Sequence, residues 1–250
     1  MTSPIQKVLS SLSSHRVQCL LIGGQACILY GGAEFSRDTD IAILTSPENL
    51  QRLEKALEEL QASAIAVPPF AVDYLLRGHA VHFRCAHPDA SGMRIDVISV
   101  MRGVDSFEEI WVRRTTVEVG PGESYEVISL PDLVRSKKTQ RDKDWPMIRR
   151  LIEANYVANR ENPTPEQIEF WLLESRTPSL LREVAAAHPA LARRLSERRP
   201  FLASINLIKD RDLEAALKSE EKREREIDRE YWKPLREELE RLRLGRKSIS

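Results

Sequence analysis

The order of secondary-structure patterns along the chain constrains its fold more than any other feature of the sequence. Roughly the first 130 residues mix short apolar runs that end at glycine with amphipathic stretches, whereas the last 100 carry helical patterns almost alone. Short β-branched runs indicate strands, and apolar residues at 3.6-residue spacing indicate helices. We therefore expect an α+β domain with a small mixed β-sheet flanked by helices over residues 1–160. An all-α region that ends in a long charged helix is expected over 161–250.

Local patterns set the expected elements. The apolar run 17–22 ends at Gly23-Gly24, which is typical of a buried strand followed by a turn. Leucines at helical spacing after Pro47 predict a helix over 48–61. The other expected strands are 38–44, 80–85, 93–100, 115–119 and 125–128, the last two as a hairpin. The other expected helices are 25–30, 131–140, 144–159, 166–174, 178–187, 189–198 and 210–244, the last kinked or interrupted at Pro234.

Composition narrows the class of protein. Lys plus Arg and Asp plus Glu are each 38, so the formal net charge is zero and a global basic field for nucleic acid is absent. Three cysteines without CxxC spacing do not form a disulfide framework. The amino terminus is too polar for a secretory signal, and no apolar run is long enough to span a membrane. We expect a cytoplasmic protein with no membrane partner.

Three acidic residues stand inside apolar strands. Asp38 and Asp40 are two residues apart on one expected strand, so their side chains share a face about 7 Å apart. Asp96 stands alone in the apolar stretch 95–99. If the two strands are neighbours, three carboxylates converge. Oxygen ligands of this kind suit Mg²⁺, which shares its other positions with water and substrate phosphates.

The Gly23-Gly24 turn adds a phosphate-binding element. Glycines at the start of a helix let backbone amides approach phosphate oxygens at the positive end of the helix dipole. Taken singly, an acid pair at a strand start more often caps a turn, and a Gly-Gly pair is weak support. The order strand, Gly-Gly, helix, Asp-x-Asp strand and later solitary Asp is much rarer than its parts.

Residues 21–24 (LIGG) followed by 36–41 (SRDTDI) resemble the signature of the DNA polymerase β-like nucleotidyltransferase superfamily, in its minimal bacterial type. Residues 94–97 resemble the strand that carries the third acid of that family. Residues 130–144 resemble the helical segment that closes the domain. The resemblance covers about residues 15–155 and implies the nucleotidyltransferase fold for that part, with the C-terminal helical region added to it.

The resemblance also implies a role for each matched residue. Asp38, Asp40 and Asp96 would be the catalytic acids and metal ligands, with Asp96 acting as, or assisting, the base on the acceptor hydroxyl. The implied cofactor is Mg²⁺, as two ions, with Mn²⁺ as a substitute. The residues implied in nucleotide binding are Gly23, Gly24, Ser36 and Arg37. Many relatives carry Arg where this chain has Glu34, and Arg37 is the candidate substitute.

A basic cluster follows the expected third acid. On a helix, Lys137 and Arg141 share a face, and Lys138 lies near it. These three side chains are candidates for binding the β- and γ-phosphates or an anionic acceptor. The alternative is a solvated face near a helix end, and the sequence favours neither.

The sequence leads to two hypotheses about function. The first is a metal-dependent nucleotidyltransferase that moves NMP from an NTP to a hydroxyl acceptor, with release of pyrophosphate. The acceptor would be a small molecule, a protein or an RNA. The second is a non-catalytic nucleotide-binding module whose C-terminal helices bind a second copy or a partner protein, as in a toxin–antitoxin pair.

Overall fold

The structure, a computed structural model, describes residues 3–33, 35–120 and 123–247. The chain folds into two compact units. The first contains Met1–Leu29, Ala33–Ser136 and Glu230–Ser250, and the second contains Tyr30–Gly32 and Lys137–Arg229. Glu34 and the Pro121-Gly122 turn of the expected hairpin lie outside the described residues. The domain boundary expected at residue 160 stays a prediction.

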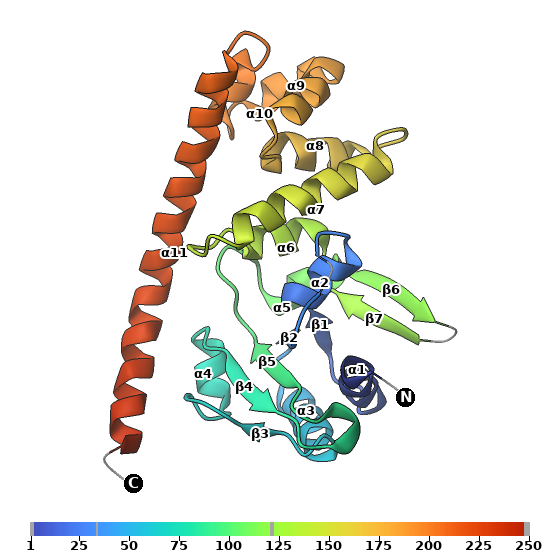
Figure 1. Cartoon of the computed structure of the whole chain (residues 1–250), viewed down its shortest axis with the longest axis vertical. Helices are drawn as coiled ribbons and strands as arrows, with labels where there is room; N and C mark the ends of the chain where they lie inside the picture. Colours follow the sequence, from blue (N-terminus) through green and yellow to red (C-terminus); the bar gives the residue numbers. More distant parts are fainter. Residues whose placement is uncertain (1–2, 34, 121–122, 248–250) are drawn as a thin grey trace. The chain divides into compact units, whose positions relative to one another are not determined.

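The first unit is built on one mixed sheet of seven described strands in the order β3-β4-β5-β2-β1-β7-β6 (Figure 1). The strands are β1 (Cys19–Leu21), β2 (Asp38–Ile43), β3 (Ser63–Ala64), β4 (Val81–Arg84), β5 (Arg94–Ile98), β6 (Thr115–Gly120) and β7 (Glu123–Val127). The α+β class is confirmed, but the expectation of a small sheet was wrong. The hairpin β6–β7 joins the sheet through the parallel pairing of Val127 with Leu21, and β3 adds an edge strand.

Strand directions place the two acid-bearing strands side by side. β2 runs parallel to β5 and antiparallel to β1, while β4 runs antiparallel to β5. The condition that we set for converging carboxylates, adjacent strands, is therefore met.

The two faces of the sheet differ in polarity. In β2 the side chains of Thr39, Ile41 and Ile43 are fully buried, whereas Asp38 and Asp40 on the opposite face are half-buried. Helices α1 (Pro4–Ser14) and α3 (Pro47–Glu59) lie together on one side of the sheet. Helices α2 (Gly23–Leu29) and α6 (Leu130–Ser136) lie together on the other side (Figure 1). Burial of Ile41 and Ile43 thus fixes which face the acids take.

Capping explains where several helices begin. α1, which the sequence patterns did not predict, starts with a capping box between Ser3 and Gln6 and has proline in its first turn. Ser106 and Glu109 form the same box at the start of α5. The remaining short elements of the first unit are α4 (Val72–Leu76), η1 (Pro88–Ala90) and α5 (Phe107–Val112).

The second unit is helical. Its elements are α7 (Asp144–Asn159), α8 (Pro165–Glu174), α9 (Pro178–Ala187), α10 (Pro189–Leu195), η2 (Pro200–Ser204) and α11 (Asp210–Lys247), whose residues from Glu230 onward belong to the first unit. α10 ends earlier than the expected residue 198, and Pro200 disfavours helical backbone at the residue before it. Pro234 lies inside α11, which continues past it, so of the two expected effects the interruption was wrong and the kink stays a prediction. Among the described residues, no helix combines the length and apolarity needed to cross a membrane.

The contact between α1 and α3 generates a pH-dependent prediction. The carboxylate of Glu59 accepts hydrogen bonds from Lys7 Nζ at 2.5 Å and Ser11 Oγ at 3.0 Å, and lies 2.9 Å from His15 Nε2. These bonds lower the pKa of Glu59 from 4.5 to about 2, and the bond from Lys7 has the largest effect. Because the folded-state pKa is lowered, the stabilisation is present above pH 4.5 and is lost as the pH falls toward 2.

We expect Glu59→Gln to lower the free energy of unfolding at pH 7 and the deficit to shrink as the pH falls from 4.5 toward 2. Urea titrations at several pH values measure this difference. Glu58→Gln, at the exposed neighbouring position, is the matched control. A deficit that is the same at every pH would contradict an ionic origin.

Candidate functional site

The polar face of β2 and β5 brings the expected acids together. In the parallel pairing, Asp40 lies opposite Asp96 and Asp38 lies opposite Arg94. Residues opposite each other in neighbouring strands project to the same face, with the strands about 4.8 Å apart. All three acids are half-buried on this face. On the next strand, β4, His82 lies opposite Asp96 and Arg84 lies opposite Arg94.

The glycine turn between β1 and α2 lies directly against one of these acids. A Cβ atom built on Gly23 would lie 2.0 Å from Asp40 Oδ2, and Gly23 has a φ of +61°. A Cβ atom on Gly24 would lie 2.4 Å from Ser36 Oγ. The Gly24 N–H donates to Asp40 Oδ2 at 3.3 Å. Glycine is therefore required at both positions for the turn to approach Asp40 and Ser36 this closely.

A buried glutamine that sequence reasoning missed fixes the entry into β2. Gln25 Nε2 donates to the carbonyl oxygens of Ser36 at 3.3 Å and of Asp38 at 3.4 Å. The Ser36 hydroxyl donates to the Asp38 carbonyl at 3.1 Å. These bonds tie α2 to the segment before β2, where Arg37 is exposed. Ser36 thus supports the backbone of the acid pair as well as facing Gly24.

Asp96 is held by two basic side chains. Arg94 donates from Nε to Asp96 Oδ1 at 2.6 Å and from Nη2 to Oδ2 at 2.9 Å, which is a bidentate pair. His82 Nδ1 lies 2.9 Å from Asp96 Oδ1 and 3.0 Å from Arg94 Nη2. Sequence reasoning gave neither side chain a role. The two-residue spacing of Arg94 and Asp96 on one strand was a usable indication of the pair, whereas His82 needed the register of β4.

The ionisation of this cluster follows from its contacts. Burial would raise the pKa of Asp96, but hydrogen bonds from His82 and Arg94 together lower it below its usual value. The hydrogen bonds to Asp96 raise the pKa of Arg94, and the charges of Asp38 and Asp40 add to that shift. Asp96 therefore remains ionised, and a lowered pKa makes it a weaker proton acceptor.

The residues present fit a divalent cation in part. Asp38 and Asp40 supply carboxylate oxygens on one face, and the Asp40 carboxylate can lie against the turn because Gly23 lacks a Cβ atom. Within the described ranges, no group of three or more His, Cys, Asp and Glu side chains is arranged to hold a metal ion. The acid pair fits a hard cation. The role of Asp96 as a third ligand is untested and stays a prediction.

The basic cluster belongs to the second unit, and its expected helical face was wrong. α6 ends at Ser136, so Lys137, Lys138 and Arg141 lie in the connection to α7. The backbone turns there because Thr139 Oγ1 accepts from the Arg141 N–H at 3.1 Å and donates to Asp144 Oδ2 at 2.5 Å.

All three basic side chains form ion pairs within their own unit. Lys137 Nζ lies 3.6 Å from Asp144 Oδ1, Lys138 Nζ lies 2.7 Å from Glu174 Oε2, and Arg141 Nε donates to Asp144 Oδ2 at 2.8 Å. Their predicted binding of phosphates stays a prediction.

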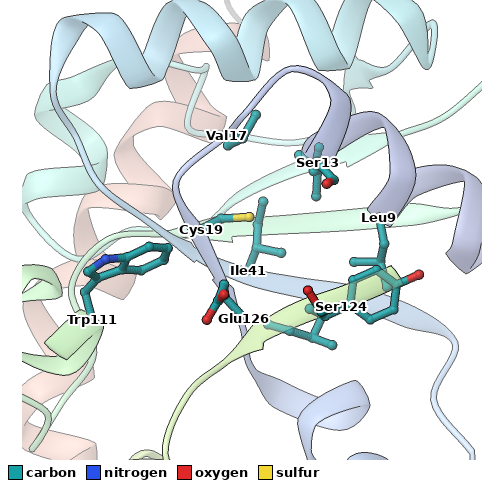
Figure 2. Close-up of a pocket in the computed structure, with 11 residues that line it drawn as sticks. Leu9, Ser13, Val17, Cys19, Ile41, Trp111, Ser124 and Glu126 are labelled. Atoms are coloured by element: carbon teal, nitrogen blue, oxygen red, sulfur yellow. The ribbon is translucent and has the colours of Figure 1, made fainter. Parts of the chain in front are cut away.

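A cavity of about 100 Å³ lies on the other face of the sheet (Figure 2). Leu9, Leu21 and Ile41 form part of its apolar wall, and Trp111 and Glu126 also line it. Because Ile41 and Asp40 are consecutive in β2, their side chains point to opposite faces. Burial, with a smaller effect of the Glu126 charge, raises the pKa of the Cys19 thiol in its wall to about 12. None of the expected site residues lines this cavity.

No protein-family profile matches this chain, and a search of curated proteins finds no match to its sequence. The case for a function therefore depends on the motif resemblance and on the geometry of the residues themselves.

The contact between the glycine turn and Asp40 generates a stability prediction. Gly23→Ala should lower the free energy of unfolding by about 1–3 kcal/mol more than Gly92→Ala does, because its methyl group would meet the Asp40 carboxylate. Gly92 is a matched control: its φ is +77°, but a Cβ atom there would meet nothing within 4 Å. Urea unfolding of both variants measures the difference. Equal losses would show that backbone strain alone selects glycine at position 23.

Proposed function

We propose that this protein is a metal-dependent nucleotidyltransferase that transfers an NMP group from an NTP to a hydroxyl acceptor and releases pyrophosphate. The proposal includes the nucleotidyltransferase fold for the sheet-containing part of the chain. Its support is the motif resemblance together with the position of Asp40, which lies against the Gly23-Gly24 turn and opposite Asp96.

The position of Asp40 carries the proposal because it joins the acid pair to the glycine turn. Two acids on one strand with a third acid on the adjoining strand repel one another, so packing alone does not favour this arrangement. On the opposite face of the same strand, Ile41 and Ile43 are fully buried. An acidic face that meets a glycine turn at a helix start combines the two elements that a metal–triphosphate substrate requires.

The transfer balances without a further reactant. The acceptor oxygen forms a bond to the α-phosphorus, the bond from that phosphorus to the bridging oxygen of pyrophosphate breaks, and the hydroxyl proton passes to a base or to solvent. Asp38 and Asp40 would hold Mg²⁺, with Mn²⁺ as a substitute, which when bound neutralises charge on the phosphate oxygens.

The chain's own residues orient the substrate in this proposal. The backbone at Gly23 and Gly24 would hold the nucleotide phosphates, with Ser36 and the exposed Arg37 beside them. Lys137, Lys138 and Arg141 of the second unit are proposed to bind phosphates or an anionic acceptor, in exchange for their present acidic partners. The acceptor is a small molecule, a protein or an RNA that carries a free hydroxyl.

Loss of an acid from the pair should abolish the transfer. We expect Asp40→Asn to lower Mg²⁺-dependent incorporation of α-labelled NMP by about 100-fold or more, the scale on which removal of a group that stabilises transition-state charge acts. Purified protein is incubated with each α-labelled NTP and cell extract, and labelled product and pyrophosphate are measured. Asp38→Asn should behave in the same way.

The matched control is Asp89→Asn. Asp89 lies on η1 in the same unit, and its side chain is 63% exposed. This variant should retain full incorporation. Full activity of Asp40→Asn would refute the proposal. Binding of NTP by the wild type without pyrophosphate release would instead support the non-catalytic module.

A further inference from the structure

The bonds to Asp96 leave little room for a metal ion on this carboxylate. A carboxylate offers about four lone-pair sites. Arg94 occupies one site on each oxygen, and His82 lies within hydrogen-bond distance of Oδ1. A cation at Asp96 would also lie beside the positive guanidinium group. The contacts of Asp96 are thus those of a partner for Arg94.

Arg94 is oriented by this pair. Its Nε and Nη2 donate to Asp96, and among the described residues no hydrogen bond from Nη1 is found. Arg94 lies opposite Asp38 in the parallel pairing, so its side chain leaves the sheet beside the acid pair. The side chain of Arg94 is 36% exposed, against 16% for Asp96. The guanidinium group is therefore fixed by Asp96 through Nε and Nη2, while the Arg94 side chain remains partly exposed to solvent.

A guanidinium group held in this way suits a phosphate oxygen. Its planar N–H donors match phosphate geometry, and fixing it beforehand lowers the entropy lost on binding. Asp96 alone would attract cations, whereas the Arg94–Asp96 pair is neutral and presents donors.

We propose that Asp96 is a positioning residue that holds Arg94 beside the Asp38–Asp40 pair, and that Arg94 binds a phosphate group of the substrate. This inference rests on the proposed function. It differs from the expectation that Asp96 is a metal ligand and base, because it assigns the metal ion to Asp38 and Asp40 alone.

Binding of Mn²⁺ separates the two roles of the acids. Free Mn²⁺ is followed by electron paramagnetic resonance during titration of the full-length protein. Asp40→Asn should raise the Kd for Mn²⁺ about tenfold or more. Asp96→Asn and Arg94→Ala should raise it by no more than about threefold over the wild type. Loss of binding in Asp96→Asn to the same extent as in Asp40→Asn would overturn the inference.

Binding of inorganic tripolyphosphate tests Arg94 without a nucleoside. Calorimetry is done at a fixed Mg²⁺ concentration. Arg94→Ala and Asp96→Asn should each weaken tripolyphosphate binding about tenfold, as expected for a lost charge-assisted contact. Arg94→Lys should also weaken it, because lysine keeps the charge but not the bidentate geometry.

A double variant shows whether Asp96 acts through Arg94. Adding Asp96→Asn to Arg94→Ala should cause little further loss of tripolyphosphate affinity. Arg84→Ala is the matched control, since Arg84 lies opposite Arg94 on β4 and its removal changes the net charge equally. Its effect should be clearly smaller. Equal losses from Arg84→Ala and Arg94→Ala would overturn the inference in favour of general electrostatics.

These outcomes are distinct from failure of the proposed function. Wild-type protein that binds neither Mn²⁺ nor magnesium tripolyphosphate would refute the proposed function itself. Wild-type protein that binds both, with variants that depart from the pattern above, would refute only the role of Arg94 and Asp96. A misfolded variant would lose both ligands together, so retained Mn²⁺ binding also reports an intact fold.

Discussion

The parallel register of β2 on β5 is the constraint on which the rest of the structure depends. Asp40 meets Asp96 only because Ile41 and Val97, one residue further along each strand, are fully buried on the other face. A shift by one residue would carry both acids into the apolar core and both apolar side chains to the polar face. The free energy of burying the apolar side therefore specifies which residues form the polar face.

Neighbouring groups on the same face offset the repulsion between the clustered acids. Arg94 pairs with Asp96, and the Gly24 N–H donates to Asp40. Gln25 and Ser36 bond to carbonyl oxygens of the segment that carries Asp38, so the backbone there stays in place without using the carboxylates. The charge of Asp96 is thus paired with that of Arg94, and the contacts of Gln25 and Ser36 order the backbone at Asp38. Asp96 therefore has a different environment from Asp38 and Asp40, although all three are acids on the same face of the sheet.

The sequence predicted what local periodicity controls and missed what depends on long-range pairing. Alternation identified β2, β5 and the face shared by Asp38 and Asp40, and α7 and α9 have the expected bounds. The size of the sheet was missed, because a single parallel pairing of Leu21 with Val127 joins the hairpin to it. The end of α6 was missed because side-chain bonds of Thr139 compete with the helix. His82 contacts Asp96 only through the register of β4 on β5.

In the proposed function, charge on the polar face would link a bound metal ion to the substrate. On this face Arg94 balances the charge of Asp96 through a bidentate pair, and Arg84 on β4 lies opposite Arg94. In the proposed function, a triphosphate would meet the metal ion held by Asp38 and Asp40, a glycine turn with backbone donors, and the guanidinium group of Arg94. Without Arg94, the unpaired carboxylate of Asp96 would repel the same triphosphate. Asp96 would therefore favour binding of an anionic substrate by positioning the Arg94 guanidinium group, although the negative charge of Asp96 alone would oppose it.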